Sequence, residues 1–289
     1  MEEVFNDFLN ATEELDEITL EGYFGEDAKN LVQSREDIGV NEYLYESLKL
    51  WIEDTNQYGK DKVKEYVVIL FKLYLDAYKQ GGQEAIDVMT AFWMGTKDNP
   101  ELECFSAYSE FVRLNTETKT ILGQLPKTNA KISQIKKAAS SITSTYSKGV
   151  EFIGKLLTTC IILKKIASNE TYNYYRIYNM TLFDKIKLFN SDSNPNHQKL
   201  TNIINRNLRN SEAHLSLNYD YKNTNFILKK KANGKIVNEN ISLNEMLLEI
   251  FPSVGWFTQA FVYSGILLVL AHDDKPSFIK SIKEIYGDV

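Results

Sequence analysis

The feature that most constrains the fold is an uncharged run near the C-terminus, VGWFTQAFVYSGILLVLA, at residues 254–271. Its length approaches that of a membrane-spanning helix. Polar residues interrupt the run at four positions: Thr258, Gln259, Tyr263 and Ser264. No basic cluster flanks it either. We therefore expect a buried terminal helix and no membrane span, so the rest of the chain must surround this helix.

The length and composition fit such a globular protein. The chain has 289 residues, enough for one large or two modest domains. It has only 5 prolines, and long apolar or mixed segments dominate, so we expect mainly helices. Cys104 and Cys160 lie in apolar helical contexts, and we expect both to be reduced core residues. The acidic N-terminus, MEEVFNDF, does not resemble a secretory signal, so a cytoplasmic protein is the default expectation.

The first part of the chain is predicted to be helical. Residues 62–79 place apolar side chains three and four positions apart, the spacing of a packed helical face: Val63, Val67, Leu70 and Tyr74. Residues 1–126 contain no motif that we associate with catalysis. The segment 122–131 combines glycine, proline and polar residues. We therefore predict an acidic N-terminal helical domain at 1–126 and a second domain at 127–289.

The second part predicts three helices, a β-hairpin and a last helix. The helices are expected at about 132–167, 171–190 and 196–214. Alternating apolar residues then indicate a meander of two or three strands at about 215–241, with a turn at Asn233-Gly234. Ser242 and Glu245 form a capping box for a final helix, which we expect to bend or break near Pro252 and Gly255. The predicted fold class is all-α, with a small inserted β-hairpin.

Charge is distributed unevenly. Residues 1–60 carry 16 acidic and 4 basic side chains, whereas residues 127–235 carry 6 acidic and 19 basic ones. A basic region is what a phosphate-binding surface needs, although lysines that merely solvate helix faces would give the same composition. The acidic N-terminal part could shield the basic face, within one chain or between protomers.

The basic region contains the stretch RNLRNSEAHL, residues 206–215, with Arg209, Asn210 and His214 close together. RNA can be cut without a metal, because its 2′-hydroxyl can attack the neighbouring phosphate. A histidine can take or give the protons of this reaction, and an arginine can stabilise the charge that develops on the phosphate. Asn210 could hold the imidazole or bind a phosphate oxygen. The alternative is a polar helix end with a half-buried structural histidine.

On a regular helix, Asn210 and His214 share one side, whereas Arg209 and His214 diverge by about 140°. One regular helix therefore cannot aim Arg209 and His214 squarely at the same atom. Either the helix ends and bends near His214, or a second copy of the motif contributes from a partner subunit.

The segment Arg209 to His214, R-N-S-E-A-H, resembles the motif of HEPN domains, in which an arginine and a polar residue precede a histidine. The motif closes the third helix of a helical unit, and the hairpin after it is similar to the prokaryotic abortive-infection type. The resemblance covers about 127–289. It implies a helical bundle that dimerises along the motif helix, and metal-independent endoribonuclease activity that leaves 2′,3′-cyclic phosphate ends. No cofactor is implied. It also implies an antiviral role as a toxin-like hydrolase, with a possible antitoxin or phage-derived trigger.

Further residues are candidates for binding RNA. Arg206 could reach the phosphate backbone. Tyr174 and Arg176 could stack on unpaired bases, although Tyr174 and Tyr178 are also spaced for helix packing. The lysines around the hairpin turn are either a solvated tip or an RNA clamp: Lys229, Lys230, Lys231 and Lys235.

Other polar residues are weaker candidates for a functional role. Glu212 lies between the motif residues, but a carboxylate beside RNA repels it. We expect His272, Asp273 and Asp274 to form a polar helix end, not a metal site, and we assign no role to His197. Two rival functions remain: a non-catalytic HEPN-type regulator that binds RNA or nucleotides or partners a toxin, and a helical scaffold in which the motif is accidental.

Overall fold

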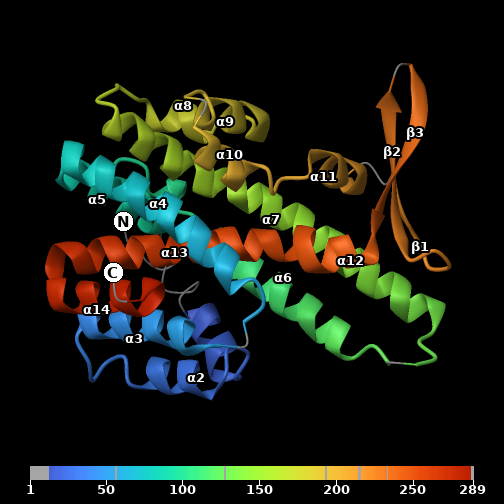
Figure 1. The fold of residues 1–289 in the computed structure, drawn as a ribbon, viewed down its shortest axis with the longest axis horizontal. Helices are drawn as coiled ribbons and strands as arrows, with labels where there is room; N and C mark the ends of the chain where they lie inside the picture. The colour runs from blue at the N-terminus through green and yellow to red at the C-terminus, as the bar shows by residue number, and fades with distance from the viewer. Residues whose placement is uncertain are drawn as a thin grey trace.

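The structure is a computed structural model that describes residues 13–55, 57–126, 128–192, 194–213, 216–232 and 234–287. His214 and Leu215 of the predicted motif, and Asn233 of the predicted turn, lie outside the described residues. The described chain is mostly helical and carries one three-stranded antiparallel sheet (Figure 1). The mainly helical class with a small β insert is therefore confirmed.

The first half forms a succession of helices. Residues 13–20 are helical, followed by α2 (Glu26–Gln33), α3 (Val40–Glu53), α4 (Lys60–Gly81), α5 (Gln83–Met94), a 3-10 turn (Pro100–Leu102) and α6 (Phe105–Gly123). The predicted apolar face of 62–79 is confirmed, because Val63, Val67, Leu70 and Tyr74 are all fully buried in α4.

The central element is α7 (Ile132–Ala167), a 36-residue helix whose predicted bounds are confirmed. It packs against α4 and α6, and against three later helices: α9 (Leu182–Phe189), α11 (Arg206–Ala213) and α13 (Phe251–Asp273). Gly149 permits one of these contacts, because a Cβ there would lie 2.7 Å from Cγ1 of Val254 and 2.8 Å from Cε2 of Phe111. Helices α6 and α13 can therefore approach α7 at the same level.

The helix predicted at 171–190 is wrong, because two helices occupy this range. They are α8 (Tyr174–Tyr178) and α9 (Leu182–Phe189). Thr181 has an extended backbone, and its side chain accepts a hydrogen bond from the Asp184 N–H, which begins α9 anew. A side-chain cap thus replaces the helical hydrogen bonds that a continuous helix would have made.

The helix predicted at 196–214 is also wrong, because α10 (Pro195–Thr201) and α11 (Arg206–Ala213) are separate. Between them, the hydroxyl of Tyr146 on α7 donates to the Ile203 carbonyl at 3.1 Å and accepts from the Asn205 N–H at 2.7 Å. The Asn205 side chain then accepts the Leu208 N–H at 3.0 Å and starts α11. The buried tyrosine satisfies the backbone groups that the break leaves without helical partners.

The sheet follows α11 in the order β1 (Leu217–Asp220), β2 (Asn225–Ala232) and β3 (Lys235–Ser242). Ala232 pairs with Lys235 across the predicted turn, which confirms the predicted hairpin. One face of the sheet is buried next to the helices: Tyr219, Phe226, Leu228 and Ile241. The outer half of the β2–β3 hairpin projects beyond the helices (Figure 1).

The C-terminal part begins at the predicted cap, where the Ser242 side chain accepts the Glu245 N–H. A single turn, α12 (Leu243–Glu245), leads through a π-helical turn (Met246–Ile250) into α13 (Phe251–Asp273). The predicted irregularity is therefore present beside Pro252, but α13 is regular at Gly255. The prediction missed a separate helix, α14 (Lys275–Tyr286), which starts where the Asp274 side chain accepts the Ser277 N–H.

The uncharged run forms most of α13, which contacts α3, α4, α7 and α14. Together with α12 it is the one helix among the described residues that is long and apolar enough to cross a membrane, and 56% of its most apolar window is buried. Phe257, Phe261 and Leu267 are fully buried. This burial is typical of the core helix of a soluble protein.

Buried residues of both predicted domains belong to one hydrophobic cluster, in which α4 packs against α7 and α13. The predicted boundary at 122–131 coincides with the connection between α6 and α7. The division into two domains stays a prediction. Cys104 and Cys160 are buried free thiols, as expected.

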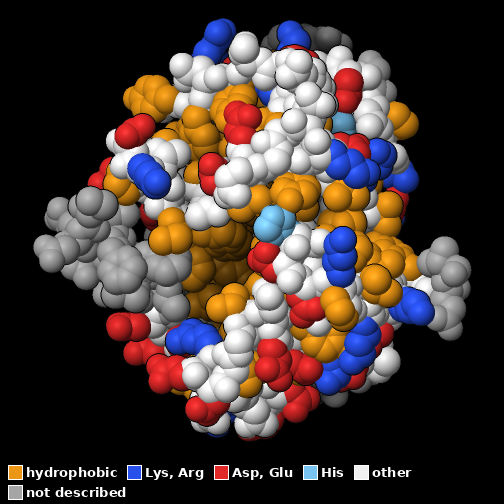
Figure 2. Space-filling model, turned by 90° about the vertical axis from the view of Figure 1, so that its left-hand side faces the viewer, with side chains coloured by type: hydrophobic (Ala, Val, Ile, Leu, Met, Phe, Trp, Pro, Cys, Tyr) orange, Lys and Arg blue, Asp and Glu red, His pale blue; other side chains and the backbone are white. Residues whose placement is uncertain are grey.

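Figure 2 views the end of the molecule that lies on the left of Figure 1. Acidic side chains gather on its lower part, at the level of α2, α3 and α14. Apolar side chains line a hollow above them, beside a histidine. Helix α11 and the hairpin lie at the opposite end of the molecule (Figure 1), so the candidate site and the acidic face are well separated.

Candidate functional site

Arg209 lies on α11 and is anchored to α7. Its Nε donates to Oε1 of Glu151 at 2.6 Å, and its Nη2 forms an ion pair with the same carboxylate. Its Nη1 donates to Oδ1 of Asn210 at 3.0 Å. Three of the five N–H bonds of the guanidinium are therefore engaged, and two are left for a ligand. The Arg209 side chain keeps 38% exposure, so those donors can reach solvent.

The backbone of α11 is also tied to α7. The hydroxyl of Ser147 donates to the Arg209 carbonyl at 3.4 Å, one helical turn before Glu151. Leu208 is fully buried and Ser211 is 4% exposed. α11 thus turns Leu208 and Ser211 inward and leaves Arg206 and Asn210 exposed, as the spacing of four residues requires.

Arg206 is oriented by an aromatic ring. Its guanidinium carbon lies 4.3 Å from the ring centroid of Phe183 on α9. Such a cation–π contact favours one position of the guanidinium over the ring. Arg206 therefore offers a preoriented positive charge at the start of α11, beside Arg209.

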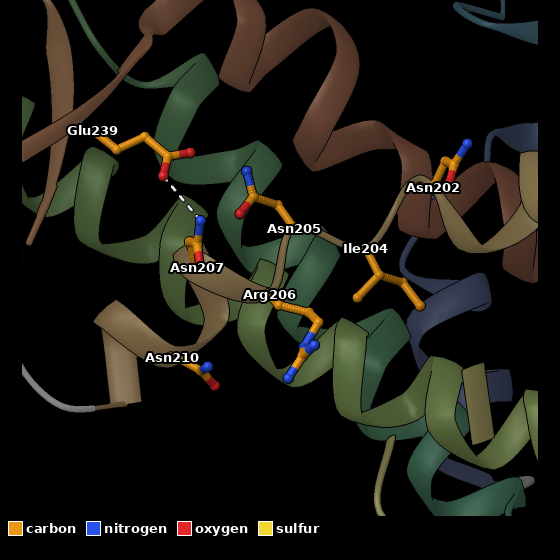
Figure 3. Close-up of a pocket in the computed structure, with 7 residues that line it drawn as sticks. All are labelled: Asn202, Ile204, Asn205, Arg206, Asn207, Asn210 and Glu239. Atoms are coloured by element: carbon orange, nitrogen blue, oxygen red, sulfur yellow. Dashed lines mark hydrogen bonds between the residues drawn. The ribbon is translucent and has the colours of Figure 1, made fainter. Parts of the chain in front are cut away.

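An open groove surrounds the first turn of α11 (Figure 3). It has a volume of about 530 Å³ and is lined by Asn202, Ile204, Asn205, Arg206, Asn207, Asn210 and Glu239. Figure 3 shows the Asn205 and Asn207 side chains on the side of Glu239, whereas Arg206 and Asn210 extend on the other side of the helix. The lining is dominated by amides, which can both donate and accept hydrogen bonds.

Glu239 on β3 connects the hairpin to α11. Its Oε2 accepts from Nδ2 of Asn207 at 2.9 Å and from Nζ of Lys230 at 2.6 Å. The charge of Lys230 is therefore largely matched within the chain. Lys229, Lys231 and Lys235 are exposed on the same hairpin. These three lysines are better placed than Lys230 to meet an anion.

The structure separates Tyr174 and Arg176 from the motif helix, because both lie on α8. Tyr174 is half-buried and packs against the core, and burial raises its pKa. Arg176 is exposed. Tyr178 packs under Nζ of Lys155 at 5.3 Å and Nζ of Lys185 at 5.7 Å from its ring centroid. Burial lowers the pKa of Lys185 to about 8.

The other histidines have local partners. His197 is 7% exposed, and its Nδ1 lies 3.1 Å from Oδ2 of Asp192. Burial lowers its pKa. His272 at the end of α13 is half-exposed and contacts Asp273. Among the described residues, no three His, Cys, Asp or Glu side chains lie together as a metal site would require.

Sequence reasoning missed the residues that hold the motif in place. Glu151, Phe183 and Glu239 come from three other elements, far from the motif in the chain. Asn205 directly precedes the stretch 206–215 and caps α11, and Asn207 lies inside it and contacts the hairpin. Their residue type could have suggested these roles. Glu212 is half-buried, and among the described residues the side-chain partners of Arg209 are Glu151 and Asn210.

In comparisons with known proteins, no family model, no curated protein and no solved structure matches this chain.

Proposed function

We propose that the chain is a metal-independent endoribonuclease of HEPN type. The observation that carries this proposal is the arrangement at α11, where Glu151 and Asn210 fix Arg209 and the preoriented Arg206 lies beside a polar groove. Residues 127–235, which include α11, carry 19 basic and 6 acidic side chains, and this excess favours a polyanionic ligand. RNA is such a ligand, and it carries its own nucleophile.

In the proposed reaction, the 2′-oxygen attacks the adjacent phosphorus while the bond from phosphorus to the 5′-oxygen breaks. A base takes the proton of the 2′-hydroxyl, and an acid protonates the leaving 5′-oxygen, so that a 2′,3′-cyclic phosphate and a 5′-hydroxyl form. The free N–H donors of Arg209 stabilise the charge on the non-bridging oxygens. His214 is assigned the proton transfers by residue type and by the family resemblance.

Binding is assigned to the side chains around the groove. Arg206, Lys229 and Lys231 meet backbone phosphates, and the exposed amides of the groove meet unpaired bases. Lys230 is expected to contribute less, because Glu239 already pairs with it. Tyr174 and Arg176 are proposed as a more distant stacking and contact point. The role in antiphage defence and an antitoxin or phage trigger rest on the resemblance alone. The homodimer along α11 rests on the resemblance and on the expected divergence of Arg209 and His214. A cytoplasmic location is the expectation from the acidic N-terminus.

The decisive experiment compares wild type with Arg209→Ala and His214→Ala on total RNA in the presence of a metal chelator, and maps the cleaved ends. Wild type should yield 2′,3′-cyclic phosphate ends, and both variants should lose at least about a hundredfold in rate. Arg113→Ala is the matched control, because Arg113 is also ion-paired but lies on α6. If RNA treated with the wild-type protein shows the same ends as RNA treated with the variants, the proposed nuclease activity is refuted.

A non-catalytic RNA-binding regulator is the second candidate. The ion pair between Arg209 and Glu151 favours it, because the carboxylate offsets much of the charge that catalysis would use. This candidate predicts that wild type binds RNA and leaves it uncut. Arg206→Ala should then weaken binding, whereas Arg209→Ala should change it little.

A further inference from the structure

The outer edge of β3 carries no neighbouring strand among the described residues, since β2 lies between β1 and β3. β3 is eight residues long and exposed along most of its length. Ile236 is 70% exposed and Val237 is 36% exposed. Edge strands with free backbone groups and apolar side chains readily accept another strand, and charges or prolines usually prevent this. Here Lys235 and Glu239 are the charged residues of β3.

The direction of the free backbone groups follows from the neighbouring strand. The Lys229 N–H donates to the Ser216 carbonyl at 3.1 Å, so the backbone of Lys229 points toward the β1 side. Lys229 is the partner of Asn238. Because the backbone of Lys229 bonds toward β1, Lys229 and Asn238 form a non-hydrogen-bonded pair of the antiparallel ladder. The N–H and C=O of Asn238 therefore point away from β2. By alternation, those of Ile236 and Asn240 do so too.

We propose that β3 pairs with β3 of a second copy of this chain, antiparallel and with Val237 opposite Val237. In this register, Ile236 and Asn238 exchange backbone hydrogen bonds across the interface. Lys235 of each copy lies directly opposite Glu239 of the other, on the same face of the sheet. This register therefore pairs the outward-pointing N–H and C=O groups of the two strands and also brings each Lys235 to a Glu239.

Charge complementarity selects this register and a second copy as the occupant. Placing Asn238 on the two-fold axis would lose both charge pairs, and placing Glu239 there would bring two carboxylates together. Asn207 and Lys230 both bind Oε2 of Glu239, which leaves its Oε1 for the incoming lysine. The pairing would join two three-stranded sheets into one of six strands, with both α11 helices on the same face. This proposal does not depend on the proposed nuclease activity.

The test is a register-specific disulfide, followed by measurement of mass in solution. Val237→Cys should form an interchain disulfide under mild oxidation, because residues opposite each other in a non-hydrogen-bonded pair have close Cα atoms. Asn238→Cys, on the same strand, should form much less. The native thiols are buried and should not compete. Equal cross-linking at both positions, or more at Asn238, would overturn the proposed register.

A proline pair tests the backbone bonds without a new thiol. In the symmetric dimer, the Asn238 N–H of each copy donates to the other copy. Asn238→Pro therefore removes two hydrogen bonds and should raise the dimer dissociation constant at least about tenfold. Lys231→Pro is the control, since by alternation its N–H points toward the β1 side and away from β3. Light scattering over about 1 to 100 µM should show that wild type loses mass on dilution as the β3 interface dissociates, whether or not the chains also pair along α11. A monomer throughout, or an Asn238→Pro protein whose mass equals that of wild type at every concentration, would overturn the proposal.

Discussion

At the scale of single residues, the contact between Arg209 and Glu151 decides how the motif can act. The carboxylate holds the guanidinium in one orientation but also offsets its charge. Both side chains are partly exposed, at 38% and 52%, so their pairing should contribute little to stability. Its effect should therefore appear in RNA binding and cleavage.

Glu151→Gln separates these two effects. Removing a negative charge beside Arg209 should raise RNA affinity, whereas a looser guanidinium should slow cleavage by about tenfold or more. Affinity can be measured on RNA with a 2′-deoxy substitution, and rate under single-turnover conditions. Glu110→Gln, which removes one of the carboxylates that pair with Arg113 on α6, is the control for the charge change. If both variants behave alike, Glu151 does not position Arg209.

His197 should make stability depend on pH. Burial lowers its pKa in the folded protein below the usual 6.5, while Asp192 and Lys164 are the charged groups that face it. As pH falls below about 6.5, the unfolded chain binds a proton that the folded chain resists, so the free energy of unfolding falls. The loss ends once the pH is below the folded pKa.

Urea unfolding at pH 7.5 and pH 5.5 would measure this loss, which should be at most about 1.4 kcal/mol per pH unit in that window. His197→Gln should unfold at a lower urea concentration at both pH values, because it loses packing against Phe189. It should, however, lose less further stability on acidification than wild type. An equal pH dependence in both proteins would contradict this assignment.

At the scale of elements, the break between α10 and α11 sets the direction of the motif helix. Tyr146 is 1% exposed and bridges the two backbone groups at the break. Its removal should therefore disturb the approach of α11 to α7.

Tyr146→Phe should destabilise the protein by about 1–3 kcal/mol, because it leaves a partly buried carbonyl and a partly buried N–H without their partner. Tyr74→Phe is the matched control. The hydroxyl of Tyr74 is buried beside the thiol of Cys160 and has no nitrogen or oxygen partner in the described chain. The control should change the free energy of unfolding by less than about 1 kcal/mol. Equal losses from the two substitutions would show that the bridge adds nothing.

The same break shows what sequence could predict. The bounds of α7 agree with the predicted range of about 132–167, because buried side chains recur along the whole of this helix. The strands and their turn were predicted because alternation and Asn-Gly are local signals. The break at 202–205 depends on a hydroxyl 57 residues away from Ile203, which no local pattern contains. α14 was different, since Asp274, Pro276 and Ser277 were a readable start signal that was missed.

The site was predictable only in part, for the same reason. Arg206, Arg209 and Asn210 are neighbours in sequence and are found together at the groove and its edge. Their partners Glu151 and Phe183 are brought to them by packing of α7 and α9. The predicted divergence of Arg209 and His214 assumes one regular helix, whereas α11 is described only from Arg206 to Ala213.

At the scale of the whole molecule, both halves contribute to one core. α4 packs against apolar faces of α7 and α13. Deleting residues 1–126 would expose them, so this truncation cannot test whether the acidic part shields RNA binding. Neutralising exposed acidic residues such as Glu21, Glu36 and Asp37 is the better test. We expect little change in affinity, because α2 and α3, which adjoin these residues in the chain, lie at the other end of the molecule from α11 and salt screens distant charges (Figure 1).

The fragment 127–289 should therefore not fold cooperatively on its own. We expect it to aggregate or to unfold without a sharp transition, whereas the full chain should show one cooperative transition. Circular dichroism during thermal unfolding of both proteins would measure this. A fragment that unfolds sharply and stays soluble would instead support two independent domains.

The short length of α11 has a dynamic consequence. It has eight mostly polar residues and is held by the Asn205 cap, Leu208 and its contacts with α7 and the sheet. Helices of this length have little stability of their own. Its amides should therefore exchange with deuterium through local opening, well before those of α7. Heating should then abolish the function of α11 at a temperature at which the rest of the protein is still folded.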